Sequence, residues 1–364
     1  MQIILTLHSD FQCLDACLLK KYEIGIMDNE RKNSIRPEWI DIVSRYNKPD
    51  NLKSWWQVIN STGAYIIMWL LMIWSLNISY WITLALTIPA AGFLVRTFII
   101  FHDCGHGSFF RSERLNAIVG VITGLLVFTP YHRWHRDHRI HHQTVGNLDK
   151  RGTGDVATLT VDEYHSRRRW QRFLYRVYRH PIFLFGLAPL LLFVVLYRFP
   201  KKYMSVREHI YVHLTNLALA MIIFSLIMAI GWKAYLMIQL PVLYIATVHG
   251  VWLFYVQHQF RHVQWSDSSS WDYKNMALQG SSFFRLPATL NWFTGNIGYH
   301  HIHHLSPLIP NYNLKKCNDE NDLFREIKPI TFWSAFESLI LRLWDEKRGI
   351  LVSFRERRRA ISPA

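Results

Sequence analysis

The stretch YWITLALTIPAAGFLVRTFIIFHDCGH, which runs from Tyr80 to His106, joins a long apolar segment directly to a pair of histidines. Its apolar part, residues 80–101, is long enough to cross a bilayer as a helix, because about 20 mostly apolar residues span the hydrocarbon core. His102 and His106 follow at once. The stretch therefore predicts a membrane span that places two histidines at one face of the membrane.

Further apolar stretches of similar length occur along the chain. They are residues 61–76, 115–131, 181–197, 212–231 and 234–256. The links at 77–79 and 232–233 are short and nearly uncharged, as expected for extracytoplasmic turns between antiparallel spans. The sequence therefore predicts two helical hairpins, at 61–101 and 212–256.

The chain is basic, with 41 Lys and Arg against 26 Asp and Glu and a formal charge of +15, although half of it is hydrophobic. Eleven of the basic residues lie between positions 131 and 180. Because Lys and Arg accumulate on the cytoplasmic flanks of membrane spans, we expect the histidine-bearing loops in the cytoplasm. The basic charge is assigned to this orientation, and no nucleic-acid partner is expected. The four cysteines, Cys13, Cys17, Cys104 and Cys317, are scattered and predict neither disulfides nor a Cys-ligated metal.

The stretches 115–131 and 181–197 have basic residues at both ends. We expect both to be re-entrant or interfacial helices, because a single full crossing by either one would move neighbouring histidine loops to opposite sides. The alternative is that both cross the membrane, which would leave a histidine group on each face.

Three histidine groups follow apolar segments. HDCGH at 102–106 has the spacing i, i+4, whereas HRIHH at 138–142 and the histidines of GYHHIHHLSP at 298–307 have the spacing i, i+3, i+4. The eight residues with these spacings are His102, His106, His138, His141, His142, His300, His303 and His304. On a helix such residues are neighbours, about 5–6 Å apart at Cβ. Neutral imidazoles gathered in this way offer lone pairs to a metal, so we predict a site for two ions.

Other histidines give weaker signals. His258, at the end of the last span, is a candidate ninth ligand or a polar residue at the membrane interface. His249, about 13 Å deeper in the membrane, lines a buried channel or packs within the span. Four more fall outside the spacing patterns and are expected beside the ligands or at the surface: His132, His135, His262 and His301.

Imidazole alone does not select a metal, since it suits Zn, Cu, Fe and Ni. Zinc hydrolases use a nearby Glu, but the histidine groups contain none, and Asp103 follows His102. Eight or nine nitrogens for two ions leave room for O₂. The pattern therefore favours redox chemistry over hydrolysis.

These features together predict an all-α integral membrane protein with two transmembrane hairpins, re-entrant or interfacial helices and a cytoplasmic helical domain that holds the di-metal site. We expect an N-terminal cytoplasmic segment at 1–54, a membrane domain at 55–314 and a basic cytoplasmic tail at 315–364. Because Met27 opens a more ordinary stretch, we expect the natural protein to begin there. The sequence indicates no oligomeric state.

Four segments resemble the membrane fatty-acid desaturases, in particular their bacterial branch similar to Δ12 or omega-6 desaturases. They are HDCGHGSFF at 102–110, HRIHH at 138–142, GVWLFYVQHQF at 250–260 and WFTGNIGYHHIHHLSPLIPNYNL at 292–314. The resemblance runs from about Trp55 to Asp345. It departs from the family after QHQF, where Arg261 and His262 stand in place of an acidic residue.

The resemblance implies a non-haem di-iron centre held by the eight spaced histidines, and it matches His258 to a further ligand near the end of the last hairpin. It also implies O₂-dependent removal of two hydrogens from adjacent methylenes of an acyl chain, in a bacterial inner membrane, with the site facing the cytoplasm. The nearest alternative is a related di-iron hydroxylase or ketolase acting on a lipid, alkane or carotenoid. A non-catalytic metal transporter is a remote alternative.

Electrons must come from an external donor, because the sequence contains no dinucleotide-binding motif, clustered cysteines or haem motif. The basic segment 167–179 is suited to an acidic ferredoxin or a cytochrome b5-like protein, or to anionic lipid headgroups. Arg96 is expected to snorkel to a headgroup or to contact a polar part of the substrate. Asp149 and Asp155 are expected to orient ligand imidazoles or to form turns.

Overall fold

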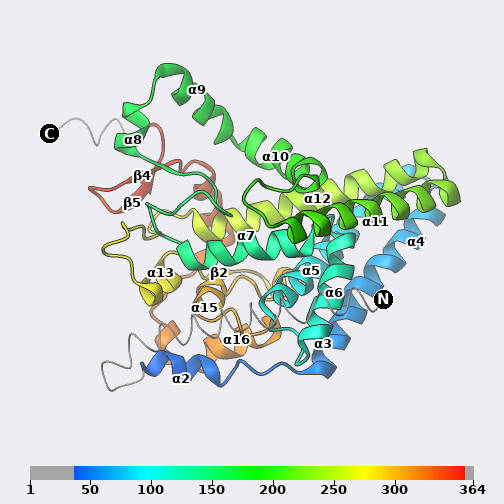
Figure 1. Cartoon of the computed structure of the whole chain (residues 1–364), viewed down its shortest axis with the longest axis horizontal. Helices are drawn as coiled ribbons and strands as arrows, with labels where there is room; N and C mark the ends of the chain where they lie inside the picture. Colours follow the sequence, from blue (N-terminus) through cyan, green and yellow to red (C-terminus); the bar gives the residue numbers. More distant parts are fainter. Residues whose placement is uncertain (1–36, 357–364) are drawn as a thin grey trace.

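The computed structural model describes residues 37–356, and these are mostly helical, as predicted (Figure 1). The expected start at Met27 and residues 357–364 of the expected tail lie outside the described residues. In Figure 1, α4, α11 and α12 extend to the right, whereas α2, α13, α15 and α16 lie toward the left. The chain is thus divided into membrane-spanning helices and a cap at one end of them.

Four helical segments are long and apolar enough to cross a membrane. They are α3 (Asn51–Val58) with the π-helical turn η1 (Ile59–Gly63) and α4 (Ala64–Ser75); α5 (Tyr80–His106); α11 (Val206–Ile230); and α12 (Trp232–His258). They form the two predicted hairpins, α4 with α5 and α11 with α12.

The first span begins at Asn51, ten residues before its predicted start. Asp50 caps it, because its carboxylate accepts hydrogen bonds from the backbone N–H groups of Leu52 and Lys53. Its first turns are less apolar than the rest, so hydropathy alone placed the start too late. The second hairpin turns at Gly231, whose φ of 82° favours glycine.

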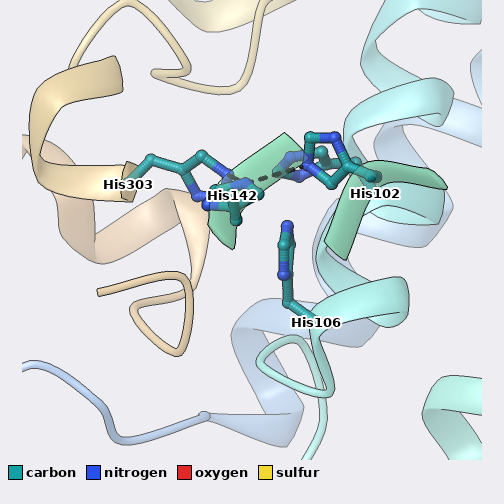
Figure 2. A group of neighbouring side chains, drawn as sticks. His102, His106, His142 and His303 are labelled. Atoms are coloured by element: carbon teal, nitrogen blue, oxygen red, sulfur yellow. Dashed lines mark hydrogen bonds between the residues drawn. The ribbon is translucent and has the colours of Figure 1, made fainter. Parts of the chain in front are cut away.

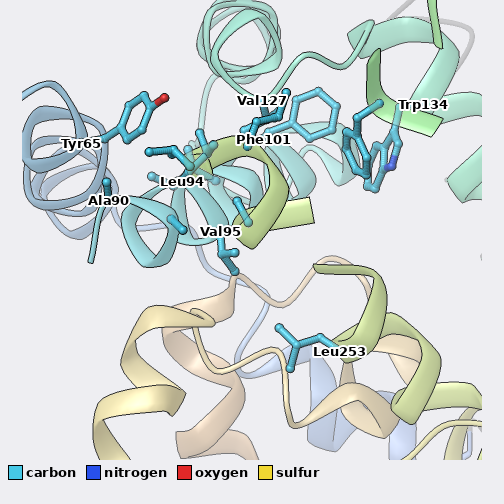
Figure 3. Packing of buried hydrophobic residues seen from close by; sticks show 14 of the residues in the cluster. Tyr65, Ala90, Leu94, Val95, Phe101, Val127, Trp134 and Leu253 are labelled. Atoms are coloured by element: carbon cyan, nitrogen blue, oxygen red, sulfur yellow. The ribbon is translucent and has the colours of Figure 1, made fainter. Parts of the chain in front are cut away.

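The core of the membrane region lies around α5, which packs against α4, α6 and α12. Ala90 and Leu94 of α5 are buried together with Tyr65 of α4, as Figure 3 shows. Further along α5, Phe101 contacts Trp134 with ring centroids 4.9 Å apart. Packing of α5 against these three helices fixes the direction in which its final turn, and its two histidines, enter the cap.

Two pairs of helices are bent rather than straight. α6 (Glu113–Leu126) and α7 (Tyr131–Thr144) meet at 102°, and α9 (Arg169–Tyr178) meets the apolar segment 182–198 at 51°. That segment consists of η2 (Ile182–Leu187), α10 (Ala188–Leu190), η3 (Leu191–Val195) and η4 (Leu196–Arg198). Gly120 allows the first bend, because a Cβ there would meet the Tyr131 ring at 2.3 Å. A sharp bend therefore stands next to each of the two apolar stretches, and such a bend is compatible with a re-entrant segment as well as with a broken span.

The cap combines short helices with two small sheets that the sequence did not predict. Its helices are α2 (Glu38–Ser44), α8 (Val161–Ser166), α13 (Tyr273–Gln279), α14 (Ala288–Phe293), α15 (His300–Leu305), α16 (Asn311–Asp319), η5 (Asp322–Phe324), α17 (Phe332–Ala335) and η6 (Phe336–Leu339). In one sheet, β4 (Leu343–Asp345) pairs with β1 (Leu159–Thr160) in parallel and with β5 (Ile350–Val352) antiparallel; in the other, β2 (Phe284–Arg285) pairs with β3 (Ile330–Thr331) in parallel.

The expected C-terminal tail is instead part of the folded cap over residues 315–356. β4 pairs with β1, and the Tyr175 hydroxyl donates to the Arg342 carbonyl at 2.6 Å. Leu343 and Leu351 are fully buried. We predicted a tail because the apolar residues of this segment are spread over short elements, which give no long periodic pattern.

Candidate metal centre

Nine buried histidines converge where α5, α7, α12 and α15 meet. They form two groups in which the ligand nitrogens lie within 4.8 Å of one another: His102, His106, His138, His142 and His303 in group one; His141, His258, His300 and His304 in group two. All eight spaced histidines are present, together with His258. The three histidine stretches at 102–106, 138–142 and 300–304, which we call boxes, therefore lie on one side of the spans, and the alternative that leaves one of them on each face is wrong.

The spacing suggested that each box with the pattern i, i+3, i+4 supplies a single group. The structure instead divides each of these two boxes between both groups. At about 100° per residue, positions i and i+4 lie about 40° apart around a helix, whereas i+3 lies about 60° to the other side. On α7, His138 and His142 therefore enter group one while His141 enters group two. On α15, His300 and His304 enter group two while His303 enters group one. Each of these helices therefore supplies two histidines to one group and one histidine to the other.

Group one is built around His142, as Figure 2 shows. The Nε2 atom of His142 lies 3.1 Å from Nε2 of His138 and 3.0 Å from Nε2 of His303. The rings of His102 and His303 have centroids 4.5 Å apart. Among the described residues, the buried Nε2 of His106 has no hydrogen-bonding partner. An inward-facing lone pair without a partner is what a bound cation would satisfy.

Group two is built around His258. Its Nε2 atom lies 3.1 Å from Nε2 of His141 and 2.9 Å from Nε2 of His300, which is in turn 3.1 Å from Nε2 of His304. The other ring nitrogen, Nδ1, hydrogen bonds to the Gly280 carbonyl at 3.2 Å. That contact turns Nε2 toward the group. The geometry thus favours His258 as a ninth ligand over a polar residue at the interface.

Two aspartates accept hydrogen bonds from the Nδ1 side of candidate ligand imidazoles. Nδ1–H of His102 donates to Asp103 at 2.9 Å, and Nδ1–H of His141 donates to Asp155 at 2.5 Å. Asp103 also accepts from the Asn311 backbone at 2.7 Å, which ties α5 to α16. Such contacts fix the tautomer that leaves Nε2 free for a metal. The sequence had suggested Asp155 for this role but had missed Asp103, whose signal was its position next to His102.

Asp149, the other candidate, does not reach a ligand. Its carboxylate accepts from the Ser268 backbone N–H at 2.8 Å, and its own N–H donates to Asn147 in a turn. It is therefore one of the turn formers of this loop.

The donor set suits two metal ions. Burial, followed by neighbouring imidazoles, holds the pKa of His304 well below its usual range, and burial has the same effect on the pKa of His303. Neutral imidazoles therefore persist at neutral pH and keep their lone pairs. Nitrogens bound about 2.1 Å from one ion lie at most about 4.2 Å apart, close to the observed spread of each group. All nine donors are nitrogens, which fits iron as well as zinc, copper or nickel.

The other candidate residues lie outside the two groups. His301 is fully buried between the rings of Phe283 and Phe324, so it is not a surface residue. His249 is exposed on α12 and hydrogen bonds to the Ile245 carbonyl, so it lines no buried channel. His132 stacks on the Tyr211 ring at 4.1 Å, His135 is half-buried, and His262 is exposed.

Arg96 neither snorkels nor is free for substrate. It is buried, and its Nε donates to the Ser61 hydroxyl at 3.0 Å. Another guanidinium nitrogen donates to the Trp292 carbonyl, and the guanidinium carbon lies 4.0 Å from the centroid of the Trp292 ring. Arg96 thus joins the first two spans to α14, which leads into the third histidine box.

Replacing Asp155 by Asn should weaken metal binding in group two. The amide accepts a hydrogen bond from His141 less strongly than a carboxylate does, so we expect affinity for one of two ions to fall about 10- to 100-fold. Chelator competition followed by metal analysis would measure it. Asp149→Asn is the matched control in the same loop. Equal retention of both ions by the two variants would contradict the role given to Asp155.

His301 predicts a pH effect on stability. Burial lowers the pKa of this ring to about 3. Below about pH 6.5 the unfolded chain binds a proton at this ring, whereas the folded chain does not. The free energy of unfolding therefore decreases as the pH is lowered, by about 2 kcal/mol at pH 5. We expect His301→Leu to lose less thermal stability than the parent between pH 7 and pH 5. The exposed His262→Leu is the control, and identical pH profiles for parent and His301→Leu would disprove the effect.

Comparison with known proteins places these features in context. A family model described as fatty acid desaturase matches residues 78–334. A fatty acid desaturase of Bacillus subtilis is 44% identical over 313 residues, which cover 86% of this chain and 89% of the relative. An sn-1 acyl-lipid omega-3 desaturase (ferredoxin) of Synechocystis is 27% identical over 64% of each chain. A chloroplastic omega-6 fatty acid desaturase of Spinacia oleracea is 24% identical over 84% of this chain and 68% of its own. The matched family region contains all nine histidines.

Proposed function

The chain belongs to the fatty acid desaturase family, and from this premise we propose that it introduces a cis double bond into the acyl chain of a membrane lipid with a histidine-held di-iron centre. Membership of the family makes the protein an oxidoreductase. The observation that carries the proposal is the pair of buried, all-imidazole groups at the end of four candidate membrane spans.

The overall reaction removes two hydrogens from adjacent methylenes and, with two electrons and two protons from outside, reduces one O₂ to two waters. Two iron ions, when bound, supply the activation of O₂ and the oxidising power that unactivated C–H bonds require. Everything else falls to the protein, which must hold the ligands, orient them and exclude water.

The surroundings of the two groups suit that task. Trp134 stacks on the His138 ring with centroids 4.3 Å apart, and Phe254 lies 5.2 Å from the His141 ring and 5.1 Å from the His258 ring. These apolar rings exclude water from the imidazoles and offer an acyl chain an apolar contact. A dry site protects a strong oxidant from side reactions.

We place the site on the cytoplasmic side of a bacterial inner membrane. The support is the basic character of residues 131–180 and the convergence of all three boxes on one side. Because no described residue group resembles a second redox centre, we assign electron delivery to an external ferredoxin or cytochrome b5-like protein. The Synechocystis relative is named as a ferredoxin enzyme.

For the position of the double bond we propose a Δ12 or omega-6 type. Its support is the resemblance of the histidine segments to that branch and the similarity to the omega-6 enzyme of Spinacia oleracea over most of the chain.

One experiment tests both chemistry and position. Fatty acids from a host that expresses the chain would be analysed by gas chromatography with double-bond localisation, beside an iron determination on the purified protein. We expect a new cis double bond and two irons per chain. A hydroxylated product without a new double bond would overturn the proposed reaction, and a double bond elsewhere would overturn only the proposed position.

A further inference from the structure

The helix α9 has a surface that the reaction does not use, and we propose that it anchors the cap in the headgroup region of the membrane by binding anionic lipids. This inference concerns a contact with the bilayer beyond the spans, and it stands whether or not the proposed double-bond position is right. The occupant is a lipid surface that carries negative charge.

One face of α9 is fixed to the rest of the protein. Tyr175 is buried, and its hydroxyl donates to the Arg342 carbonyl at 2.6 Å. Arg179, just past the end of the helix, is fully buried and donates to the side chains of Tyr255 and Gln259 at 3.1 and 2.8 Å. Since Tyr255 and Gln259 lie at the end of α12, where that span leaves the membrane, α9 is held close to the membrane boundary.

A second face is apolar and exposed. Trp170, Phe173, Leu174 and Val177 are 57, 64, 54 and 42% exposed. At about 100° per residue, these four positions fall on one side of the helix, away from Tyr175. A soluble surface seldom gathers aromatic and aliphatic side chains in this way, and such a patch indicates a partner.

A third face is basic. Arg169, Arg172 and Arg176 lie between the buried and apolar faces, and Arg167 and Arg168 precede the helix. Arg176 donates to the Tyr164 hydroxyl at 2.7 Å, whereas within residues 37–356 no carboxylate pairs with Arg169 or Arg172. A helix with an apolar face, a neighbouring arginine row and a Trp is typical of helices that lie in the surface of an anionic membrane.

The neighbouring chain identifies the partner as lipid. After the 51° bend, residues 182–198 continue as an apolar segment that satisfies, together with α9, the length and hydropathy of a membrane helix. Its Ile182 and Leu187 are also exposed. The exposed apolar face of α9 therefore runs into a segment that itself requires lipid. An acidic protein would complement the arginines but would leave this apolar continuation uncovered.

The experiment uses the full chain in nanodiscs that hold one copy each. A fluorophore is attached to Phe173→Cys, with Cys13 and Cys17 replaced by Ser; Cys104 and Cys317 are buried. The matched control carries the label at Asp162→Cys, an exposed polar position on α8. Spin-labelled lipid serves as quencher, in discs of phosphatidylcholine alone or mixed with phosphatidylglycerol.

We expect quenching at position 173 to exceed that at position 162 severalfold, and to increase with phosphatidylglycerol. Arg169→Gln with Arg172→Gln should remove the increase, because those two charges face the headgroups. Equal, weak quenching at both positions would overturn the proposal. Shielding of the label at 173 only when an acidic electron donor is added would also overturn it, in favour of a protein-docking surface.

Discussion

Replacing His142 by Ala is expected to abolish double-bond formation and to remove one metal ion per chain. Its Nε2 atom lies within 3.1 Å of those of both His138 and His303, so it is central to group one. Its ring also stacks on His304 of group two with centroids 4.1 Å apart. Loss of this side chain removes a ligand from one group and a packing contact from the other.

The measurements are iron per chain and product formation in the expressing host. His262→Ala, which removes an exposed imidazole in a loop, is the matched control and should keep both. A cooperative thermal transition of the metal-free protein checks that the variant still folds, although its midpoint should be lower because a buried ring and its packing on His304 are lost. Two irons per chain in His142→Ala would contradict the assignment of His142 as a ligand.

The membrane part of the fold was predictable because hydropathy reports what the bilayer requires. The predicted spans 80–101 and 234–256 are within α5 and α12, and both hairpins are confirmed. The cap was less predictable. β1 and β4 are two and three residues long and meet across more than 180 positions, so no local pattern signals their pairing.

The sequence predicted which histidines come together at the candidate site, but it did not predict how they divide between the two groups. Spacing selected the eight histidines, since residues three or four apart share a helix face. How His141 and His303 are assigned depends on the rotation of α7 and α15 about their axes, which packing between distant segments sets. Asp103 and the buried state of His301 depend on the same long-range packing, and no spacing rule reports it.

Replacing Arg179 by Met should disrupt group two from outside it. Arg179 is fully buried and makes five hydrogen bonds, to the Ala157 and Leu341 carbonyls and to the side chains of Thr158, Tyr255 and Gln259. Methionine is of similar length but donates none of them. The Leu341 carbonyl and the Gln259 side chain keep other donors, whereas the Ala157 carbonyl loses the donor that Arg179 provides. Leaving a buried acceptor unpaired costs about 1–3 kcal/mol, so we expect a loss of stability of about that size.

The loss should also reach the metal centre, because Gln259 and Tyr255 flank His258 at the end of α12. Without Arg179, this end loses the guanidinium that links it to Leu341 and to residues 157–158. The direct hydrogen bonds of Tyr255 to Leu341 and of Thr158 to Gln259 remain, so Nε2 of His258 is aimed at group two less firmly. We therefore expect Arg179→Met to bind its second ion at least about tenfold more weakly. Arg179→Lys, which keeps the charge and part of the hydrogen bonding, should be intermediate.

Arg169→Met is the matched control, since it removes an exposed guanidinium from the same helix. Metal titration and the thermal midpoint, both measured in detergent, separate two roles for Arg179. A purely structural residue would lower the midpoint and leave the ratio of the two metal affinities unchanged, whereas a residue that positions His258 must change that ratio. These hydrogen bonds reach group two both through the end of α12, which carries His258, and through residues 157–158, which follow Asp155, so a changed ratio would show that Arg179 positions ligands of group two.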